Sequence, residues 1–285
     1  KMPPEKLARL LKIPIISGIV KKKILTGLGL DQVYWACGGA APMPTALLDW
    51  YMKLGLQIVE AYGMSENCAV SHATLLGKPR PGTVGPQYDG VQTRIDPATG
   101  EVQMISGGLM LGYYKEPELT KQAFTEDGWL KTGDKGSIDA EGNLKITGRV
   151  KDLFKTGKGK YVAPAPIEDK LSTHPSIEAC CVTGANLGQP LGLLMLNPDA
   201  AAKAKDSAGR TALETSLAEH LKAVNAKLDP HEQLDCVVIT AEAWSVENDI
   251  LTPTMKVKRN KIEDIFAANY EKWVGMKKKV IWSNG

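Results

Sequence analysis

The sequence predicts an α/β chain in two parts, and three observations support this. Two short apolar runs, 33–37 and 57–61, each end in a loop of small and polar residues, which is typical of neighbouring parallel strands with ligand loops at their ends. From about Gly82, short alternating runs broken by turn signals predict a small antiparallel barrel or sheet. Beyond Lys160, helical and strand patterns alternate, so we expect a compact α+β unit there.

Each element follows from its local pattern. Helical periodicity at Leu7, Leu10 and Leu11, and again at Ile24 and Leu28, predicts a helical start. The remaining predictions are helices at 45–54, 167–171 and 213–228, and strands at 93–95, 102–105, 144–147, 178–183 and 236–240.

The polar, Lys- and Gly-rich loop that ends at Lys160 predicts a domain boundary. We place the division between residues 1–150 and residues 151–285. The first part is interpreted as a portion of a larger domain.

Composition limits the class of function. The 285 residues include 35 Lys+Arg and 32 Asp+Glu, a formal charge of +3, with 43% hydrophobic and 24% charged residues. These values exclude disordered and collagen-like chains. A charge this close to zero creates no global field for nucleic acid, so we expect no nucleic-acid partner and only a small polyanion, bound locally.

Neither a membrane span nor a disulfide framework is predicted. The longest apolar stretch near the start, 13–20, is interrupted and far shorter than the roughly 20 residues that cross a bilayer, and no signal peptide is visible. The five cysteines form no CxxC pair and no metal-binding spacing. We therefore expect a reducing, cytoplasmic location, with peripheral membrane contact left open.

Five motifs carry a family resemblance through their order along the chain. They are Gly38-Gly39-Ala40-Ala41-Pro42, Tyr62-Gly63-Met64-Ser65-Glu66, Gly128-Trp129-Leu130-Lys131-Thr132-Gly133-Asp134, Gly148-Arg149-Val150-Lys151-Asp152 and Thr252-Pro253-Thr254-Met255-Lys256. In this order they resemble the acyl-adenylate-forming enzymes, from Gly38 to Ile262. The loop 154–164 and the form of the last motif are similar to the long-chain fatty acyl-CoA synthetase branch.

The resemblance implies a fold and a reaction. The fold is the C-terminal part of a large adenylate-forming domain, a parallel α/β sheet with a small β-barrel, followed by a small mobile α+β domain. The reaction is attack of a fatty acid on ATP to give acyl-AMP and pyrophosphate, then transfer of the acyl group to CoA. The substrates and cofactors implied are a fatty acid, ATP or AMP, Mg²⁺ and CoA.

For the first reaction the resemblance assigns three catalytic residues: Lys256, Glu66 and Ser65. Lys256 would neutralise repulsion between the carboxylate and the α-phosphate. Glu66 would hold Mg²⁺, a metal that prefers oxygen ligands, and Ser65 would contact the α-phosphate. Taken alone, Glu66 is equally an acid at a helix N-terminus, and the lysines around Lys256 are a solvated face or polyanion patch.

The nucleotide would be bound by small residues and by one aromatic ring. The implied set is Gly39, Ala40, Ala41, Tyr62, Gly63, Met64, Asp134 and Arg149. Small residues let the adenine approach the backbone, Tyr62 would stack on it, and Asp134 would accept hydrogen bonds from the ribose hydroxyls. The alternatives are an ordinary glycine turn, a core tyrosine and an Asx turn at Asp134.

The resemblance places a hinge at Lys151 and a CoA-binding loop at Gly157, Lys158 and Gly159. The alternative for the two glycines is an exposed linker.

The phosphate loop of that family has no counterpart between Lys1 and Asp31, where 26–29 is the nearest candidate. We therefore expect a C-terminal fragment that lacks this loop. Two other functions stay open: an adenylation enzyme that loads a carrier protein, and a non-catalytic nucleotide-binding fragment.

Overall fold

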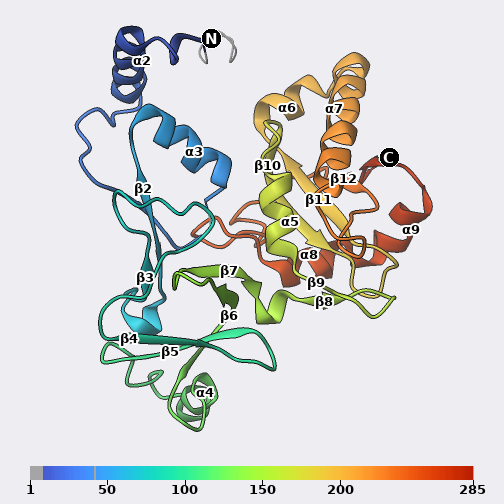
Figure 1. Ribbon diagram of the computed structural model, residues 1–285. Coiled ribbons are helices and arrows are strands. Elements are labelled where there is room, and N and C mark those ends of the chain that lie inside the picture. The colour runs from blue at the N-terminus through green and yellow to red at the C-terminus, as the bar shows by residue number, and fades with distance from the viewer. Residues whose placement is uncertain (1–8, 42, 285) are drawn as a thin grey trace. The chain divides into compact units, whose positions relative to one another are not determined.

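The computed structural model describes residues 9–41 and 43–284, which form two compact units (Figure 1). Of the described residues, the first unit holds those up to Ile95 with 103–132 and 137–146, and the second holds 96–102, 133–136 and those from Thr147 onward. Leu7 and Pro42, which belong to predicted elements, lie outside the described residues.

The first unit contains the two predicted parallel strands. Strand β1 (Ala36–Gly38) pairs in parallel with β2 (Ile58–Tyr62), and β2 pairs antiparallel with the short β3 (His72–Ala73). The predicted helix between the first two is α3 (Thr45–Leu54), which ends at Gly55 in the left-handed conformation that glycine favours. Helix α2 (Pro14–Gly27) precedes them. This arrangement brings the loops after β1 and β2 to the same edge of the sheet.

A four-stranded sheet follows, where the sequence predicts a small barrel or antiparallel sheet. Its order is β4 (Val91–Ile95), β5 (Glu101–Ser106), β6 (Leu130–Ile138) and β7 (Leu144–Arg149), and α4 (Pro117–Ala123) lies in the link between β5 and β6. Val102, Met104, Leu130 and Leu144 are fully buried. These four apolar side chains build the core of the sheet.

The second unit is a mixed sheet with helices on both faces (Figure 1). Strand β10 (Ile177–Thr183) pairs antiparallel with β11 (Leu191–Leu196), and β12 (Val237–Ile239) and β13 (Val280–Trp282) continue in parallel. The helices are α5 (Pro164–Leu171), α6 (Pro198–Lys203), α7 (Ser207–Asn225), α8 (Arg259–Phe266) and α9 (Tyr270–Gly275), with the short turns η2 (Val150–Asp152) and η3 (Ala267–Asn269).

Alternate strand residues build two cores on opposite faces of this sheet. Val182 and Leu194 pack with α5 and α7, whereas their neighbours Cys181 and Leu193 pack with α8 and α9 around Trp273. Successive side chains of a strand point to opposite faces, so one sheet supports both layers.

Several sequence predictions are wrong at the ends of elements. Helix α7 begins at Ser207 instead of 213, because the Asp206 carboxylate accepts a hydrogen bond from the Gly209 N–H at 2.7 Å and caps the helix. The loop ending at Lys160 contains a hairpin, β8 (Phe154–Lys155) with β9 (Tyr161–Val162). Strands β11 and β13 were not predicted.

Candidate active site

The candidate residues fall into two sets, one in each unit. The first unit carries Gly39, Ala40, Ala41, Tyr62, Gly63, Met64, Ser65 and Glu66, and the second carries Asp134, Arg149, Lys151, Gly157, Lys158, Gly159 and Lys256. Each set is described within its own unit.

The loop after β1 lies against the end of β2. A Cβ on Gly39 would stand 3.0 Å from the Ala61 carbonyl oxygen, and Ala40 has a φ of 63°. A larger side chain at position 39 would therefore push the two strand ends apart. Gly39, Ala40 and Ala41 are exposed, and their small side chains leave the backbone accessible to a flat ligand.

The loop after β2 is held by its own backbone. A Cβ on Gly63 would lie 2.4 Å from the carbonyl carbon of Ala69, which no side chain can tolerate. Cys68 and Ala69 both have positive φ, 58° and 56°. Such consecutive strained residues persist only where the surrounding contacts fix them.

Asn67 supplies those contacts and was not predicted as a site residue. It is 1% exposed, and its Oδ1 accepts a hydrogen bond from the Met64 N–H at 2.9 Å. Its Nδ2 donates to the Met104 sulfur at 2.7 Å. The only sequence signal was its place directly after the Tyr-Gly-Met-Ser-Glu motif. Asn67 therefore shapes the loop that presents Ser65 and Glu66.

Glu66 is half-buried and Ser65 is exposed. Glu66 Oε1 accepts a hydrogen bond from the Tyr113 hydroxyl at 2.8 Å, and this bond raises the pKa of Tyr113. The Met110 N–H donates to the Glu66 carbonyl at 2.7 Å. Tyr113 was not predicted either, because it lies 47 residues away from Glu66 in the sequence. The three-residue 3₁₀ turn η1 (Ser65–Asn67) that carries Glu66 is too short to generate much of a helix dipole, which weakens that alternative.

No cluster of three or more His, Cys, Asp or Glu side chains capable of holding a metal occurs within residues 9–41 and 43–284. Mg²⁺ commonly binds through one or two carboxylates, with substrate phosphates and water completing its shell. Glu66, beside the exposed hydroxyl of Ser65, fits that donor set.

Tyr62 is half-buried and packs beside a histidine. Its ring centroid lies 6.2 Å from that of His72, across the β2–β3 pair. His72 is 1% exposed, its Nδ1 lies 2.6 Å from Ser71 Oγ, and burial lowers its pKa to about 4. A neutral imidazole therefore supports one side of the tyrosine.

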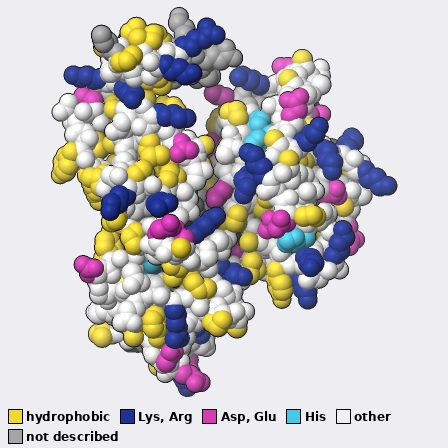
Figure 2. All heavy atoms as spheres, viewed as in Figure 1, with side chains coloured by type: hydrophobic (Ala, Val, Ile, Leu, Met, Phe, Trp, Pro, Cys, Tyr) yellow, Lys and Arg dark blue, Asp and Glu magenta, His cyan; other side chains and the backbone are white. Residues whose placement is uncertain are grey.

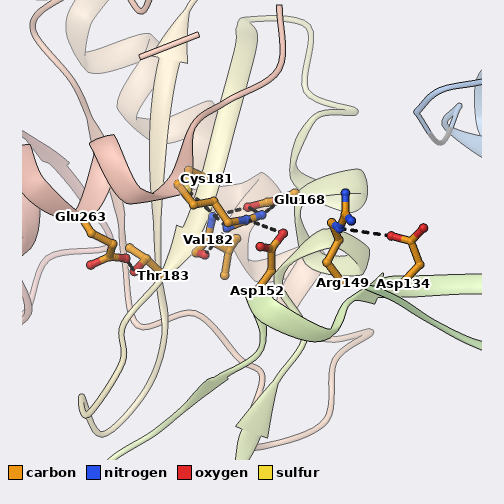
Figure 3. Close-up of polar contacts among 9 residues, drawn as sticks. Asp134, Arg149, Asp152, Glu168, Cys181, Val182, Thr183 and Glu263 are labelled. Carbon is orange, nitrogen blue, oxygen red and sulfur yellow. Dashed lines mark hydrogen bonds and ion pairs between the residues drawn. The ribbon is translucent and has the colours of Figure 1, made fainter. Parts of the chain in front are cut away.

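In the second unit, Asp134 and Arg149 lie side by side (Figure 3). Arg149 Nε is 3.2 Å from Asp134 Oδ1, with the Asp134 side chain 17% exposed and that of Arg149 58% exposed. Asp134 follows Gly133, which has a φ of 72° and whose N–H donates to Glu101 Oε1 at 2.8 Å. The structure thus brings together two residues of the implied nucleotide-binding set, Asp134 for the ribose and Arg149 for the ribose or a phosphate.

Lys256 lies exposed in a tight turn. Thr252 N–H donates to the Lys256 carbonyl at 2.8 Å, and Lys256 N–H donates to Thr252 Oγ1 at 3.0 Å. Met255 adopts a φ of 62°, and a bridge between the buried Leu251 and Val257 closes the base. These contacts hold the backbone of the turn that carries the exposed Lys256.

The cations next to Lys256 are paired with acids. Lys258 and Lys261 both contact Asp249, the latter at 3.2 Å. Arg259 contacts Glu168 and Asp152. On the visible face in Figure 2, Lys and Arg are scattered with acidic side chains between them. The interpretation of this run as a polyanion patch is therefore disfavoured.

Lys151 is exposed within η2, and Lys158 is exposed within the β8–β9 hairpin loop. A Cβ on Gly157 would lie 2.6 Å from the Asn186 carbonyl oxygen, and Gly157 N–H donates to the Leu187 carbonyl at 2.7 Å. Gly159 has a φ of 78°. The loop is thus packed against 184–188, unlike a plain linker.

A hollow of about 190 Å³ in the first unit is lined by none of the candidate residues. Its walls are Trp35, Val59, Ala73, Thr74, Leu75, Leu76, Pro86, Gln87 and Tyr88.

The chain resembles known proteins over most of its length. Long-chain-fatty-acid–CoA ligase FadD15 of Mycobacterium bovis is 33% identical over 272 residues, covering 91% of this chain and 45% of that protein. Long-chain-fatty-acid–CoA ligase 5 of Rattus norvegicus is 30% identical over 272 residues, covering 87% of this chain and 40% of that protein. The chain spans less than half the length of these relatives.

Solved structures share the fold. The anthranilate CoA ligase AuaEII in complex with anthranoyl-AMP has a TM-score of 0.67 at 25% identity, covering 84% of this chain and 46% of that one. The adenylation domain of a carboxylate reductase from Mycobacterium chelonae has a TM-score of 0.75 at 24% identity, covering 94% and 44%, and supports the fold alone.

None of the helices in the described part of the chain is long and apolar enough to cross a membrane. Residues 7–114 match the family described as AMP-binding enzyme, and residues 151–273 match the AMP-binding enzyme C-terminal domain. Together with the five ordered motifs and the shared fold, these matches show that the chain belongs to the AMP-binding enzyme family.

Proposed function

We propose that the protein carrying this chain activates a long-chain fatty acid with ATP to acyl-AMP, and then transfers the acyl group to CoA. The observation that carries this proposal is the match, over about nine-tenths of the chain, to relatives named long-chain-fatty-acid–CoA ligases. The geometry supports it, because the candidate residues lie in loops and turns that hydrogen bonds and packing hold rigid.

In the first step the chain's residues position charge. Lys256 projects a cation from its rigid turn, and that charge would offset the repulsion between the carboxylate and the phosphate as they meet. The Ser65 hydroxyl would donate a hydrogen bond to the α-phosphate. Glu66, oriented by the Tyr113 hydroxyl, would hold Mg²⁺, which supplies positive charge to the phosphate oxygens when bound.

Each set of residues would contribute its own contacts to the nucleotide. Gly39, Ala40 and Ala41 would admit the adenine to the backbone. Tyr62 would form its opposite wall, stacked on the ring, and the adjoining Gly63 and Met64 would belong to the same nucleotide-binding loop. Asp134 would accept hydrogen bonds from the ribose hydroxyls, and Arg149 would donate to the ribose or a phosphate. Arg149 Nε lies 3.2 Å from Asp134 Oδ1.

For the second step we propose a hinge at Lys151 and a CoA-binding loop at Gly157, Lys158 and Gly159. The packing of Gly157 against Asn186 supports this, because it holds the loop in one conformation. We further propose a cytoplasmic location, supported by five free cysteines, and peripheral contact with a bilayer that would supply the fatty acid.

One product assay separates these possibilities. The natural protein that carries the chain is incubated with palmitate, ATP, Mg²⁺ and CoA, and then with an acyl-carrier protein in place of CoA. Palmitoyl-CoA and AMP in equal amounts support the proposal. Acyl-AMP that transfers only to the carrier would favour a carrier-loading enzyme. AMP binding without acyl-AMP would favour a non-catalytic nucleotide-binding protein.

A further inference from the structure

Arg259, the first residue of α8, joins three segments that are far apart in the sequence. Its Nη2 donates to both oxygens of Glu168 in α5, at 2.6 Å for Oε1. Its Nε donates to Asp152 Oδ2 at 3.2 Å, and its Nη1 donates to the Val182 carbonyl at 3.1 Å. Its three partners Glu168, Asp152 and Val182 are labelled close to one another in Figure 3, where dashed lines mark these contacts.

The contact with Val182 completes the edge of a sheet. Strand β10 is the first in the order β10-β11-β12-β13, so its outer backbone groups have no neighbouring strand. Glu168 Oε1 accepts a hydrogen bond from the Val182 N–H at 2.6 Å, and Arg259 donates to the carbonyl of the same residue. Glu168 and Arg259 therefore bind each other and also satisfy both backbone groups of Val182 at the strand edge.

The guanidinium is charged and largely enclosed. The Arg259 side chain is 26% exposed. The side chain of Glu168 is 17% exposed and that of Asp152 is 31% exposed. Burial acts to lower the pKa of Arg259, but the surrounding negative groups, with Glu168 first among them and Asp152 adding to it, together outweigh burial and raise the pKa above its ordinary value. A planar fork of donors can serve three acceptors at once, which an ammonium group cannot do in the same geometry.

The two ends of this network adjoin two proposed functional segments. Asp152 directly follows the proposed hinge residue Lys151, and Arg259 stands three residues after the proposed adenylation lysine, Lys256. Between Lys256 and Arg259, the Lys258 N–H donates to the Ile250 carbonyl at 2.8 Å, so the turn and the helix start are joined.

We propose that Arg259 is a positioning residue that holds Asp152 and the Lys256 turn in one fixed arrangement. Asp152 then moves together with α5 and α8, and rotation at the hinge is confined to Lys151 and the residues before it. This inference rests on the proposed function for the roles of Lys151 and Lys256, whereas the coupling itself is a property of this chain and is testable without activity.

The test is limited proteolysis of the folded chain with a protease that cleaves after lysine only. Lys151 and Lys256 are both exposed, so each reports local opening of its segment. Rates are measured for wild type, Asp152→Asn, Arg259→Gln and the matched control Arg210→Gln, which removes an exposed guanidinium paired with Glu214. Each rate is divided by that of a synthetic peptide with the same substitution, and thermal melting checks that each variant is folded.

Asp152→Asn is expected to speed cleavage after Lys151 about fivefold and to leave cleavage after Lys256 unchanged, because Glu168 still holds Arg259. Arg259→Gln is expected to speed cleavage at both sites by a similar factor. Arg210→Gln changes neither. Equal rates at Lys151 in wild type and Asp152→Asn, or a change at only one site in Arg259→Gln, would overturn the coupling.

A second measurement links the coupling to turnover in the natural protein. Arg259→Gln should lower ATP–pyrophosphate exchange and acyl-CoA formation together, whereas Asp152→Asn should lower acyl-CoA formation several times more than exchange. The same ratio in both variants would contradict a positioning role at the hinge. If wild type shows neither half-reaction, the proposed function fails, while the proteolysis result still decides whether Arg259 couples the two segments.

Discussion

Gly63 is a residue at which packing within the chain is enough to explain the absence of a side chain. The carbonyl carbon of Ala69, a backbone atom, would lie 2.4 Å from a Cβ at this position, and the backbone of residue 63 fixes where that Cβ stands. Because neither can rotate away, the loop 63–69 would have to shift as a whole, together with Ser65 and Glu66.

Gly63→Ala is therefore expected to lower the free energy of unfolding by about 2 kcal/mol or more, through overpacking and strain. Urea unfolding followed by circular dichroism measures this. Gly107→Ala is the matched control in the same unit, since a Cβ there meets nothing within 4 Å. Equal midpoints for the two variants would show that the loop tolerates the shift.

At the same scale, sequence patterns identified the motif residues but not the residues that orient them. Asn67 and Tyr113 act through partners 37 and 47 residues away, Met104 and Glu66. Such contacts depend on the pairing of strands and loops in three dimensions, which periodicity does not contain. Conversely, the pairing of Asp134 with Arg149 follows from neighbouring strands β6 and β7 that the turn signals did predict in part.

The β8–β9 hairpin is the element on which the second half-reaction is proposed to depend. Its loop is joined to 184–188 by backbone hydrogen bonds, Gly157 N–H to the Leu187 carbonyl at 2.7 Å and Asn186 N–H to the Lys155 carbonyl at 2.9 Å. Thr156, between them, is 4% exposed. The sequence predicted only a polar loop here, because two-residue strands are too short to show alternation.

Gly157→Ala is expected to displace this hairpin, since the added Cβ would meet the Asn186 carbonyl oxygen at 2.6 Å. In the natural protein, kcat/KM for CoA should fall about tenfold or more, as expected for a misplaced binding loop. Gly188→Ala, where a Cβ meets nothing within 4 Å, is the control on the facing segment. A Gly157→Ala enzyme with unchanged kcat/KM for CoA would remove this loop from the proposed CoA site.

Over the whole molecule, the free energy of unfolding depends on pH through groups whose pKa is shifted when the chain folds. His72 has a folded pKa of about 4 against an ordinary value of about 6.5. Above pH 6.5 the residue is neutral whether folded or unfolded, so it does not affect stability there. As the pH falls from 6.5 to about 4, the unfolded chain binds the proton first and stability is lost. Glu60 acts in the opposite sense, because burial raises its pKa to about 7 and stability is lost as the pH rises toward that value.

The contribution of His72 is therefore best measured as a difference between variants. Between pH 7.5 and pH 4, wild type should lose up to about 3 kcal/mol more free energy of unfolding than His72→Gln, at about 1.4 kcal/mol per pKa unit. Urea titrations at several pH values give both curves, and His231→Gln serves as the control. Parallel curves for wild type and His72→Gln would show that folding does not lower the pKa of the His72 imidazole.

The mixed class of fold could be predicted because turn signals and strand-end loops are local features. The two-sided core of the second unit could not, since β11 and β13 join the sheet from positions 191–196 and 280–282. The Arg259 network is equally non-local, because Asp152 lies 107 residues before it. The residues that support the motif residues are therefore the hardest to predict, because they lie far from them in the sequence.

The central claim is that Lys256 serves adenylation in a fatty-acid-activating site, and one pair of half-reactions tests it most directly. In the natural protein, Lys256→Ala should abolish palmitate-dependent ATP–pyrophosphate exchange, because the variant lacks the positive charge that is proposed to offset the repulsion between the carboxylate and the α-phosphate. The same variant should form palmitoyl-CoA from synthetic palmitoyl-AMP at close to the wild-type rate. Exchange at the wild-type level in Lys256→Ala would contradict the account.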